Sequence, residues 1–375
     1  MPSFSSCPNP SCSWHHGSPD RAWFSRFGRY HSLVHGDIPR FRCHACGRTF
    51  SERTFSPEYY LKRTGRLEDV FRHCCEGMSN RAVARTLGLS PHAVQNRIER
   101  LSRQSIALHQ SIRPYADPHE DVAIDGFVSF DRSQYFPSEI TLSITARSRF
   151  ILELAHASRR RSGTMTDAQQ RKAAELYAHA HFEPAAIRRS FRQILDTLAR
   201  ERPGSRYHPL VIITDEKPDY RTELYRHRLF KRQDEDHRIA HLRVNAHLPR
   251  TVHNPLFPSN YLDRELRKDQ ANHRRETSCF TRCASCGLAR MMCYIAYHNY
   301  WKRFRIKAPV QDMRVHAEAA GISASILHTA RTAFFTERSF LSKQALSVPL
   351  ERIWRMSTPT PGVDAGRSMP LFALD

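Results

Sequence analysis

Two acidic residues occupy apolar segments whose composition is typical of buried β-strands. Asp125 lies within residues 122–128, and Asp215 ends residues 210–215, directly before a turn-forming Lys-Pro pair. A carboxylate inside a buried strand is costly unless it is paired or binds a metal. If a sheet brings the two acids together, their hard oxygen atoms can hold divalent cations. For either segment alone, an acid that only caps a turn is the simpler interpretation.

A third acid is expected on a charged helix over residues 260–276. Leu262 and Leu266 mark the side of this helix that faces the core, and Asp263 and Glu265 fall on either side of that apolar line. Helical geometry does not choose between these two acids. A solvated, salt-bridged helix face is the alternative interpretation. Basic residues of the same stretch would lie beside this site, where phosphates would be held: Arg264, Arg267, Lys268, Arg274 and Arg275.

Two pairs of cysteines near the N-terminus have the spacing of a metal site. Cys7 and Cys12 flank a Pro-Asn-Pro-Ser turn, and Cys43 and Cys46 enclose a His-Ala dipeptide. Two such turns can present four thiolates tetrahedrally, as structural Zn²⁺ requires. His15 or His16 could replace one thiol. We expect a β-hairpin around the second pair and almost no hydrophobic core, so that the metal would supply the folding free energy.

A second group of cysteines, by contrast, is expected along one helix over residues 279–305. Four ligands spread along a single helix cannot enclose one ion, which argues against a second zinc site. The group consists of Cys279, Cys283, Cys286 and Cys293.

Between the first cysteine module and the first acid, the sequence predicts a helix-turn-helix. Helices are expected over residues 67–75 and 80–87, and a third begins at Pro91, with Ser79 and Ser90 as N-caps. A plain three-helix bundle is the alternative. The third helix carries polar residues that can contact the major groove of DNA: His92, Gln95, Asn96, Arg97 and Arg100.

The remaining patterns indicate a multidomain α/β protein. Strands are expected at residues 122–128, 139–146, 150–155, 210–215 and 241–245, with a helical insertion at about 158–209. We therefore predict a zinc ribbon (1–60), a helix-turn-helix domain (61–113), a catalytic domain (119–310) and a helical C-terminal tail (311–375), to which no chemistry is assigned.

Charge and hydropathy limit the class of partner and the location. The 375-residue chain has a formal net charge of +21, which favours a polyanionic partner. It contains no apolar run of about 18–20 residues and no signal-peptide pattern, so we expect a cytoplasmic protein that does not enter a membrane. In that compartment cysteines are expected as thiols or metal ligands.

The order of these motifs resembles bacterial insertion-sequence transposases of the DDE type, over roughly residues 1–305. The resemblance is carried by the ribbon and helix-turn-helix, by Ile-Asp-Gly at 124–126, Ile-Thr-Asp at 213–215 and Leu-Asp-Arg-Glu at 262–265, and by an Arg-x-Thr-x-x-Phe stretch at Arg275, Thr277 and Phe280.

The resemblance implies a ribonuclease-H-like catalytic domain in which three acids bind two divalent ions, Mg²⁺ or Mn²⁺. Carried over, the acids are Asp125, Asp215 and either Asp263 or Glu265. Asp263 is preferred because family members tend to have a basic residue directly after the acid, as Arg264 is here, although many members have Glu at this position.

The function this implies is a transposase that binds the ends of its mobile element and cleaves and joins DNA strands. Its partner would be double-stranded DNA, bound by a homodimer or a higher homo-oligomer. Two alternatives share parts of the pattern. A DNA-binding regulator with a decayed catalytic domain would keep the ribbon and the helix-turn-helix, and a nuclease of phage or repair origin would keep the metal site without end recognition.

Overall fold

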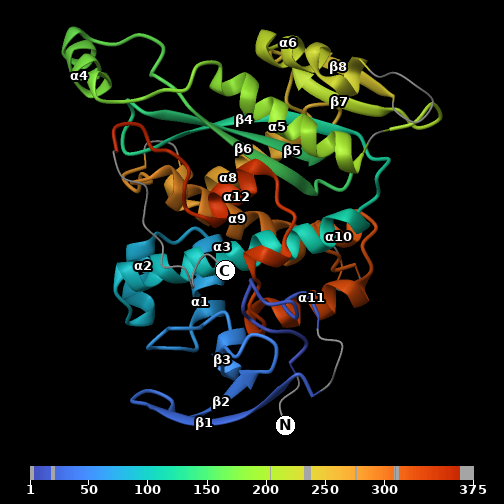
Figure 1. The fold of residues 1–375 in the computed structure, drawn as a ribbon. Helices are drawn as coiled ribbons and strands as arrows, with labels where there is room; N and C mark the ends of the chain where they lie inside the picture. The colour runs from blue at the N-terminus through green and yellow to red at the C-terminus, as the bar shows by residue number, and fades with distance from the viewer. Residues whose placement is uncertain are drawn as a thin grey trace.

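The computed structural model describes residues 4–17, 22–202, 204–231, 238–274, 277–307, 309 and 312–363. Figure 1 shows a small three-stranded sheet at one end of the molecule, a helical layer in the middle and a five-stranded sheet at the other end. No helix in these described ranges is both long and apolar enough to cross a membrane.

The small sheet contains the cysteine module and is larger than the sequence predicts. Its strands β1 (Phe24–Ser32), β2 (Gly36–Cys43) and β3 (Thr49–Phe50) pair in that order, and β2 and β3 form the hairpin expected around the second cysteine pair. Strand β1 was not anticipated. The expectation of an almost absent core was wrong, because aromatic rings pack around the cysteines: Phe4, Trp23, Phe24, Phe41, Phe50 and Phe55.

The first two of the three helices that follow begin and end where the sequence predicts, and the third begins where it predicts. They are α1 (Leu67–Cys75), α2 (Asn80–Leu87) and α3 (Pro91–Ile112). The Ser79 hydroxyl accepts a hydrogen bond from the Ala82 amide, and the Ser90 hydroxyl accepts one from the Ala93 amide. Gly88, with φ +63°, closes the turn between α2 and α3, a conformation that glycine adopts at little cost.

The larger sheet is mixed, as the α/β pattern predicts. Its order is β6-β5-β4-β7-β8, with antiparallel pairing among the first three strands and parallel pairing of β4 with β7 and of β7 with β8. The strands are β4 (Val122–Phe130), β5 (Pro137–Thr145), β6 (Ile151–Ser158), β7 (Leu210–Asp215) and β8 (Ile239–Val244).

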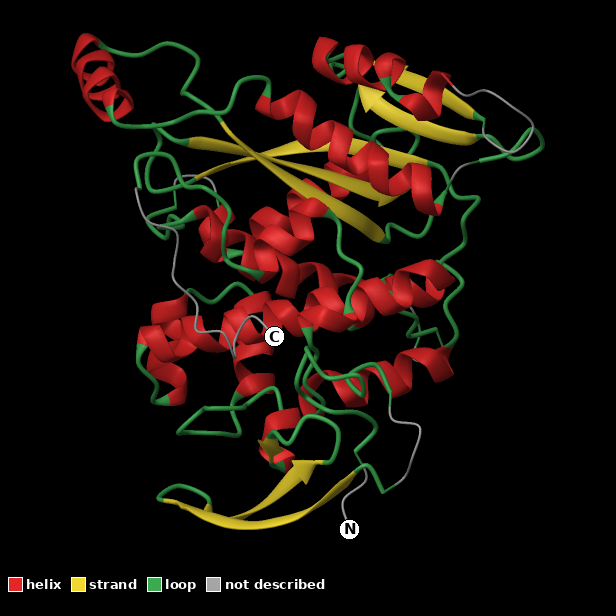
Figure 2. Ribbon diagram, in the orientation of Figure 1, coloured by secondary structure: helices red, strands yellow, loops and turns green. Residues whose placement is uncertain are grey.

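Helices cover both faces of this sheet (Figure 2). Helix α5 (Ala186–Glu201) contacts β5 and β6, and α6 (Pro218–Arg226) and α7 (Arg228–Lys231) follow β7. Helix α8 (Phe257–Asp269) contacts β4 and β5, while α9 (Ala284–Tyr300) contacts α3 and β6. The predicted helical insertion contains two helices. Helix α5 packs on the large sheet, while α4 (Asp167–Ala178) projects from the body of the molecule (Figure 1).

Two expected helices differ in extent from those observed. The helix expected over residues 260–276 begins earlier, because Pro258 is tolerated in its first turn, and ends at Asp269, where Gln270 becomes extended. The helix expected over 279–305 starts only at Ala284, since Cys283 caps it. After β7, helix α6 ends at Arg226, because the backbone of His227 is extended, and the short helix α7 follows.

The C-terminal part is helical, as expected, and it packs against the rest of the chain. It contains α10 (His316–Ala319), α11 (Ala324–Thr336) and α12 (Val348–Trp354), and α11 and α12 both contact α3. Short 3₁₀ helices occur at Glu52–Phe55, Arg113–Tyr115, Ala271–His273 and Leu341–Lys343. One apolar cluster extends from Leu67 to Met356, so α1–α3 share a core with the large sheet. The proposed domain boundaries remain predictions.

Candidate zinc site and candidate acidic active site

The four N-terminal cysteines converge in the geometry of a metal site. The sulfur atoms of Cys7 and Cys46 are 3.7 Å apart, those of Cys12 and Cys43 are 3.8 Å apart, and all four lie within 4.8 Å of one another. Tetrahedral zinc with Zn–S distances of about 2.3 Å requires sulfur separations of about 3.8 Å. The group can therefore bind a metal ion such as zinc.

The thiols of this group have divergent acidities in the absence of a metal. Burial raises the pKa of Cys7 strongly. Burial also favours the neutral thiol of Cys46, but hydrogen bonds from the Arg48 backbone, the Asn9 side chain and neighbouring thiols outweigh it and lower the pKa of Cys46 to about 7. A metal binds thiolates, so occupancy would remove protons from the group.

His15, which the sequence offered as an alternative ligand, has both ring nitrogens within hydrogen-bond distance of other groups. Its Nδ1 lies 2.7 Å from the Cys7 carbonyl oxygen and its Nε2 lies 2.6 Å from the Ser342 hydroxyl. The ring of His16 packs edge-on against that of His15. The cluster formed within the described residues consists of the four cysteines alone.

The later cysteines have other surroundings. The Cys283 sulfur accepts a hydrogen bond from the Cys286 amide at the start of α9, Cys279 is exposed, and Cys293 is buried. The neighbouring Cys74 and Cys75 are also buried, with sulfurs 3.9 Å apart.

The acids Asp125 and Asp215 lie on adjacent parallel strands in matching register. Val122 pairs with Ile212 and Ala123 with Ile213, so continuing the register aligns residue 125 with residue 215. Paired residues of neighbouring parallel strands point to the same face, with the strands about 4.8 Å apart. For Asp125 this is the face covered by α8, because the Phe127 ring packs against His273 and Arg267 on the same side.

Asp263 of α8 completes the cluster. Burial, together with the charges of Asp263 and Asp215, raises the pKa of Asp125 to about 7. Burial also raises the pKa of Asp263 to about 6, against the opposing charges of Arg267 and Arg250. Like charges have these effects only when the groups are near, so the carboxylates of Asp263 and Asp215 lie in the neighbourhood of Asp125. Their oxygen atoms are more widely spaced than the four sulfurs, since among the described residues only the cysteine group has all its ligand atoms within 4.8 Å of one another.

Glu265 does not join this cluster. Its carboxylate receives an ion pair from Lys268 at 2.8 Å and another from Lys302. Although burial favours its protonated form, these two lysines outweigh that effect and lower the pKa of Glu265. Residues two apart on a helix are separated by about 200° around its axis, so the structure places Asp263 and Glu265 on different sides of α8.

A buried polar group beside the acids was not anticipated from the sequence. The Lys217 ammonium donates to Glu139 at 2.5 Å, and the Tyr220 hydroxyl donates to the same carboxylate at 3.2 Å. The Glu139 carboxylate would lie 2.5 Å from a Cβ at Gly126, so a larger residue beside Asp125 would force the Glu139 side chain to move. Lys217 also opposes the rise in the pKa of Asp125. Its position two residues after Asp215 was the signal available in the sequence.

Helix α3 carries the five residues proposed to contact DNA. Four of them form hydrogen bonds within the protein, and His92 points to solvent. His92 is exposed. The Gln95 amide hydrogen-bonds to Asn80 and Glu99, and the Asn96 oxygen accepts a hydrogen bond from Arg100.

The two arginines of this helix fix the segment that precedes α1. Arg97 donates to the Arg63 carbonyl and Arg100 to the Pro57 carbonyl. Burial lowers the pKa of Arg100 to about 10, and the nearby charges of Arg338 and Arg97 act in the same direction.

The basic residues proposed around α8 differ in availability. Arg264 is exposed, whereas the Arg267 guanidinium donates to the carbonyls of His273 and Val128. Lys268 is paired with Glu265, and Arg274 donates to the Gly77 carbonyl. Arg275 lies outside the described residues.

Asp125, Asp215 and Asp263 offer carboxylate oxygens, the type of ligand that Mg²⁺ and Mn²⁺ prefer. No protein-family model and no curated protein sequence matches this chain. The chemistry of the two candidate sites therefore has to be argued from their residues.

Proposed function

We propose that this protein is a DDE-type transposase, an enzyme that binds the ends of its mobile element and cleaves and joins DNA in a metal-dependent reaction. The observation that carries the proposal is the convergence of Asp125, Asp215 and Asp263. Burial and the charges of Asp263 and Asp215 raise the pKa of Asp125, so ionised carboxylates are costly here unless cations neutralise them.

The residues present fit a pair of divalent ions. Asp125, Asp215 and Asp263 would hold Mg²⁺ or Mn²⁺, and their oxygen donors match the preference of both ions. Two bound ions supply a deprotonated water or 3′-hydroxyl and stabilise the leaving oxyanion of a phosphodiester. The Lys217–Glu139 pair would position the end of β7, because its ammonium follows Asp215 by two residues.

The arrangement of the large sheet supports a ribonuclease-H-like catalytic domain. Three antiparallel strands precede two parallel ones, and the first acid lies on the central strand β4. The second acid ends the adjacent strand β7. Both acids therefore lie on neighbouring strands within the sheet.

The remaining parts support a DNA partner. The net charge of +21 favours binding to a polyanion. The cysteine module would carry structural zinc, and the capped helices α2 and α3 would contact double-stranded DNA. We propose a homodimer or higher homo-oligomer on the DNA, since two element ends must be brought together.

A DNA-binding regulator with an inactive catalytic domain is the second candidate. The net charge and the ribbon and helix-turn-helix favour it equally, because neither depends on the acids. The two candidates differ in one property, metal-dependent cleavage of DNA.

The test is cleavage of a plasmid that carries the gene with its native flanks, by the purified full chain in Mg²⁺. We expect strand cleavage at the flanks, lost in Asp125→Asn and in Asp215→Asn, while DNA affinity is retained. Asp167→Asn, on the exposed start of α4, removes one acid far from the site and should cleave normally. DNA binding without cleavage in the unaltered chain would favour the regulator.

A further inference from the structure

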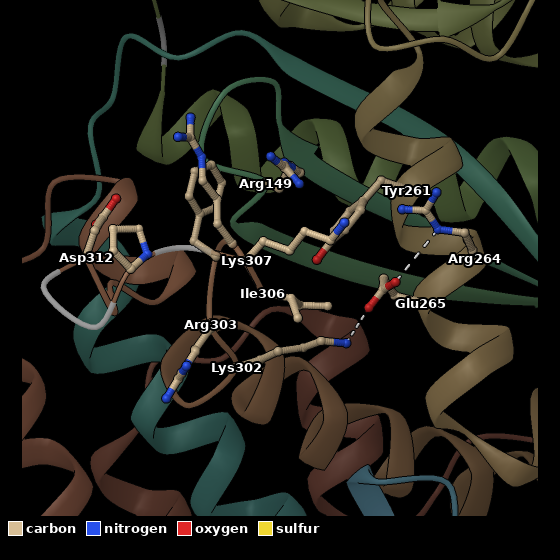
Figure 3. A pocket seen from close by; sticks show the side chains of 12 residues that line it. Arg149, Tyr261, Arg264, Glu265, Lys302, Arg303, Ile306, Lys307 and Asp312 are labelled. Carbon is tan, nitrogen blue, oxygen red and sulfur yellow. Dashed lines mark hydrogen bonds and ion pairs between the residues drawn. The ribbon is translucent and has the colours of Figure 1, made fainter.

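A basic cavity of about 460 Å³ opens beside α8 (Figure 3). Its wall combines residues of α8, of the segment that follows α9, and of the turn between β5 and β6. Six basic side chains and two acids line it: Arg149, Arg264, Lys302, Arg303, Arg305, Lys307, Glu265 and Asp312.

Both acids in this wall already have partners. Figure 3 shows Glu265 between Arg264 and Lys302, and Lys268 pairs with the same carboxylate at 2.8 Å. Asp312 pairs with Arg314 at 2.6 Å. Within the part of the chain that the structure describes, Arg149, Arg303, Arg305 and Lys307 have no ion pair, so the cavity has an excess of positive charge.

Arg149 is held at this cavity at a conformational cost. Its φ of +54° lies in the left-handed region, which a long side chain rarely adopts. Its guanidinium lies 4.8 Å from the Tyr261 ring centre and 4.5 Å from that of Phe304. Burial lowers the pKa of Arg149, and the positive charges of Arg305 and Arg264 lower it further. Backbone strain and unneutralised charge together indicate a site built for an anion.

We propose that this cavity binds backbone phosphates of the same DNA that is held at the acids, an inference that rests on the proposed function. Arginine forms charge-assisted, bidentate hydrogen bonds with phosphate. The cavity and the acids lie on different sides of α8, because Glu265 faces one and Asp263 the other.

The width of α8 sets which phosphates the cavity would reach. A helix with its side chains is about 10 Å across, and one DNA strand advances about 3.4 Å per base pair. The bound phosphates would therefore belong to nucleotides neighbouring the phosphodiester at the acids and not to that phosphodiester itself.

The test is the salt dependence of DNA binding by the full chain with Arg305→Gln and Lys307→Gln. Both side chains are exposed, so the double variant is expected to fold. Arg171→Gln with Lys172→Gln, on exposed positions of α4, is the matched control with the same loss of charge. The probe is duplex DNA from the gene's own flanks. Loss of two phosphate contacts should reduce the slope of log affinity against log salt by about 1.8, whereas the control should keep the original slope.

An unchanged slope in the cavity variant, or an equal reduction in the α4 control, would overturn the proposal. A second arm titrates the chain with inorganic phosphate at constant ionic strength. Phosphate binding that the cavity variant abolishes, with no change in the DNA slope, would assign the cavity to a small anion instead and also overturn it. Cleavage is scored separately in the unaltered chain. A reduced slope without any cleavage would therefore reject the transposase and keep the cavity as a DNA site.

Discussion

Asp125 is the most unfavourably placed of the three acids while no cation is bound. Burial and the charges of Asp263 and Asp215 all favour its protonated form, and its pKa rises to about 7. A bound divalent ion is the largest local charge in such a site and reverses this balance. We therefore expect a bound cation to stabilise the ionised form of Asp125 more than that of the other two acids.

The contrast between Asp263 and Glu265 gives a prediction that separates two neighbouring acids. Asp263→Asn should lower the cleavage rate by on the order of 10²–10³-fold, because it removes a proposed metal ligand. Glu265→Gln should cleave at a rate within about tenfold of normal but unfold at a lower temperature, since it leaves Lys302 without one of its carboxylate partners. Cleavage rates and thermal unfolding of both variants provide the comparison. Normal cleavage in Asp263→Asn with none in Glu265→Gln would assign the third acid to Glu265.

Buried histidines predict how stability changes with pH. His109 lies between the Tyr300 hydroxyl and the Leu152 carbonyl, at 2.8 Å from each. Burial lowers its pKa to about 3, and the charge of Arg113 acts in the same direction. Unfolded histidine titrates near 6.5, so the unfolded chain takes up the proton first as the pH falls. The stabilisation by neutral His109 is complete above pH 6.5 and is lost progressively towards pH 3.

The loss at this one residue should be about 1–2 kcal/mol between pH 7 and pH 5. Urea denaturation of the full chain at the two pH values measures it. His109→Gln, which cannot titrate, should lose less stability over the same interval. An identical loss in the variant and the unaltered chain would mean that His109 is not responsible.

Among the secondary-structure elements, the cysteine module gives the most direct prediction. The purified protein should contain about one zinc ion per chain, because the four sulfurs have tetrahedral spacing. Cys43→Ser with Cys46→Ser should lose the metal, while Cys279→Ser, at an exposed cysteine outside the cluster, should retain it. Mass spectrometry measures the zinc content of the unaltered protein and of both variants. Zinc retained in the Cys43/Cys46 variant would place the ion elsewhere.

Elements with strong local signals could be predicted from the sequence. Ser79 and Ser90 set the starts of α2 and α3, and alternating apolar residues identified β5. Strand β1 carried no such signal, because its residues are exposed along nearly its whole length. The start of α9 was missed because a cysteine, Cys283, serves as its N-cap.

The candidate acidic site could be predicted only in part. Asp125 and Asp215 were identifiable because each interrupts an apolar strand, and parallel pairing then aligns them. The choice between Asp263 and Glu265 depends on how α8 is rotated against the sheet, which the packing of distant segments decides. Glu139 gave no local signal, since its importance comes from Lys217 and Tyr220, about 80 residues later.

In the molecule as a whole, the helical layer and the acidic site are connected through buried contacts. The Arg290 guanidinium donates to Asn80 of α2 at 2.8 Å and to Gln270, directly after α8, at 3.0 Å. It also donates to the carbonyls of Cys74 and Met78. In the proposed function, this arrangement would hold the DNA-contacting helices in a fixed position relative to the acids that act on the same DNA.

The ribbon is tied to the other end of the sequence in the same way. His15 contacts Ser342, and the Gln104 amide on α3 donates to the Phe334 carbonyl. These contacts join the N-terminal module, the helical layer and the C-terminal helices. In the proposed function, these contacts would couple DNA recognition to cleavage.

The central claim, that Asp125 is a metal ligand for DNA cleavage, is tested most directly by changing which metal the site accepts. Thiolate is a softer ligand than carboxylate and binds Mg²⁺ poorly, while Mn²⁺ tolerates it better. Cleavage of the flank-bearing plasmid by Asp125→Cys should be absent in Mg²⁺ and partly restored in Mn²⁺, whereas Asp125→Ala should stay inactive in both. Cleavage by Asp125→Cys or Asp125→Ala in Mg²⁺ at the rate of the unaltered chain would contradict the claim.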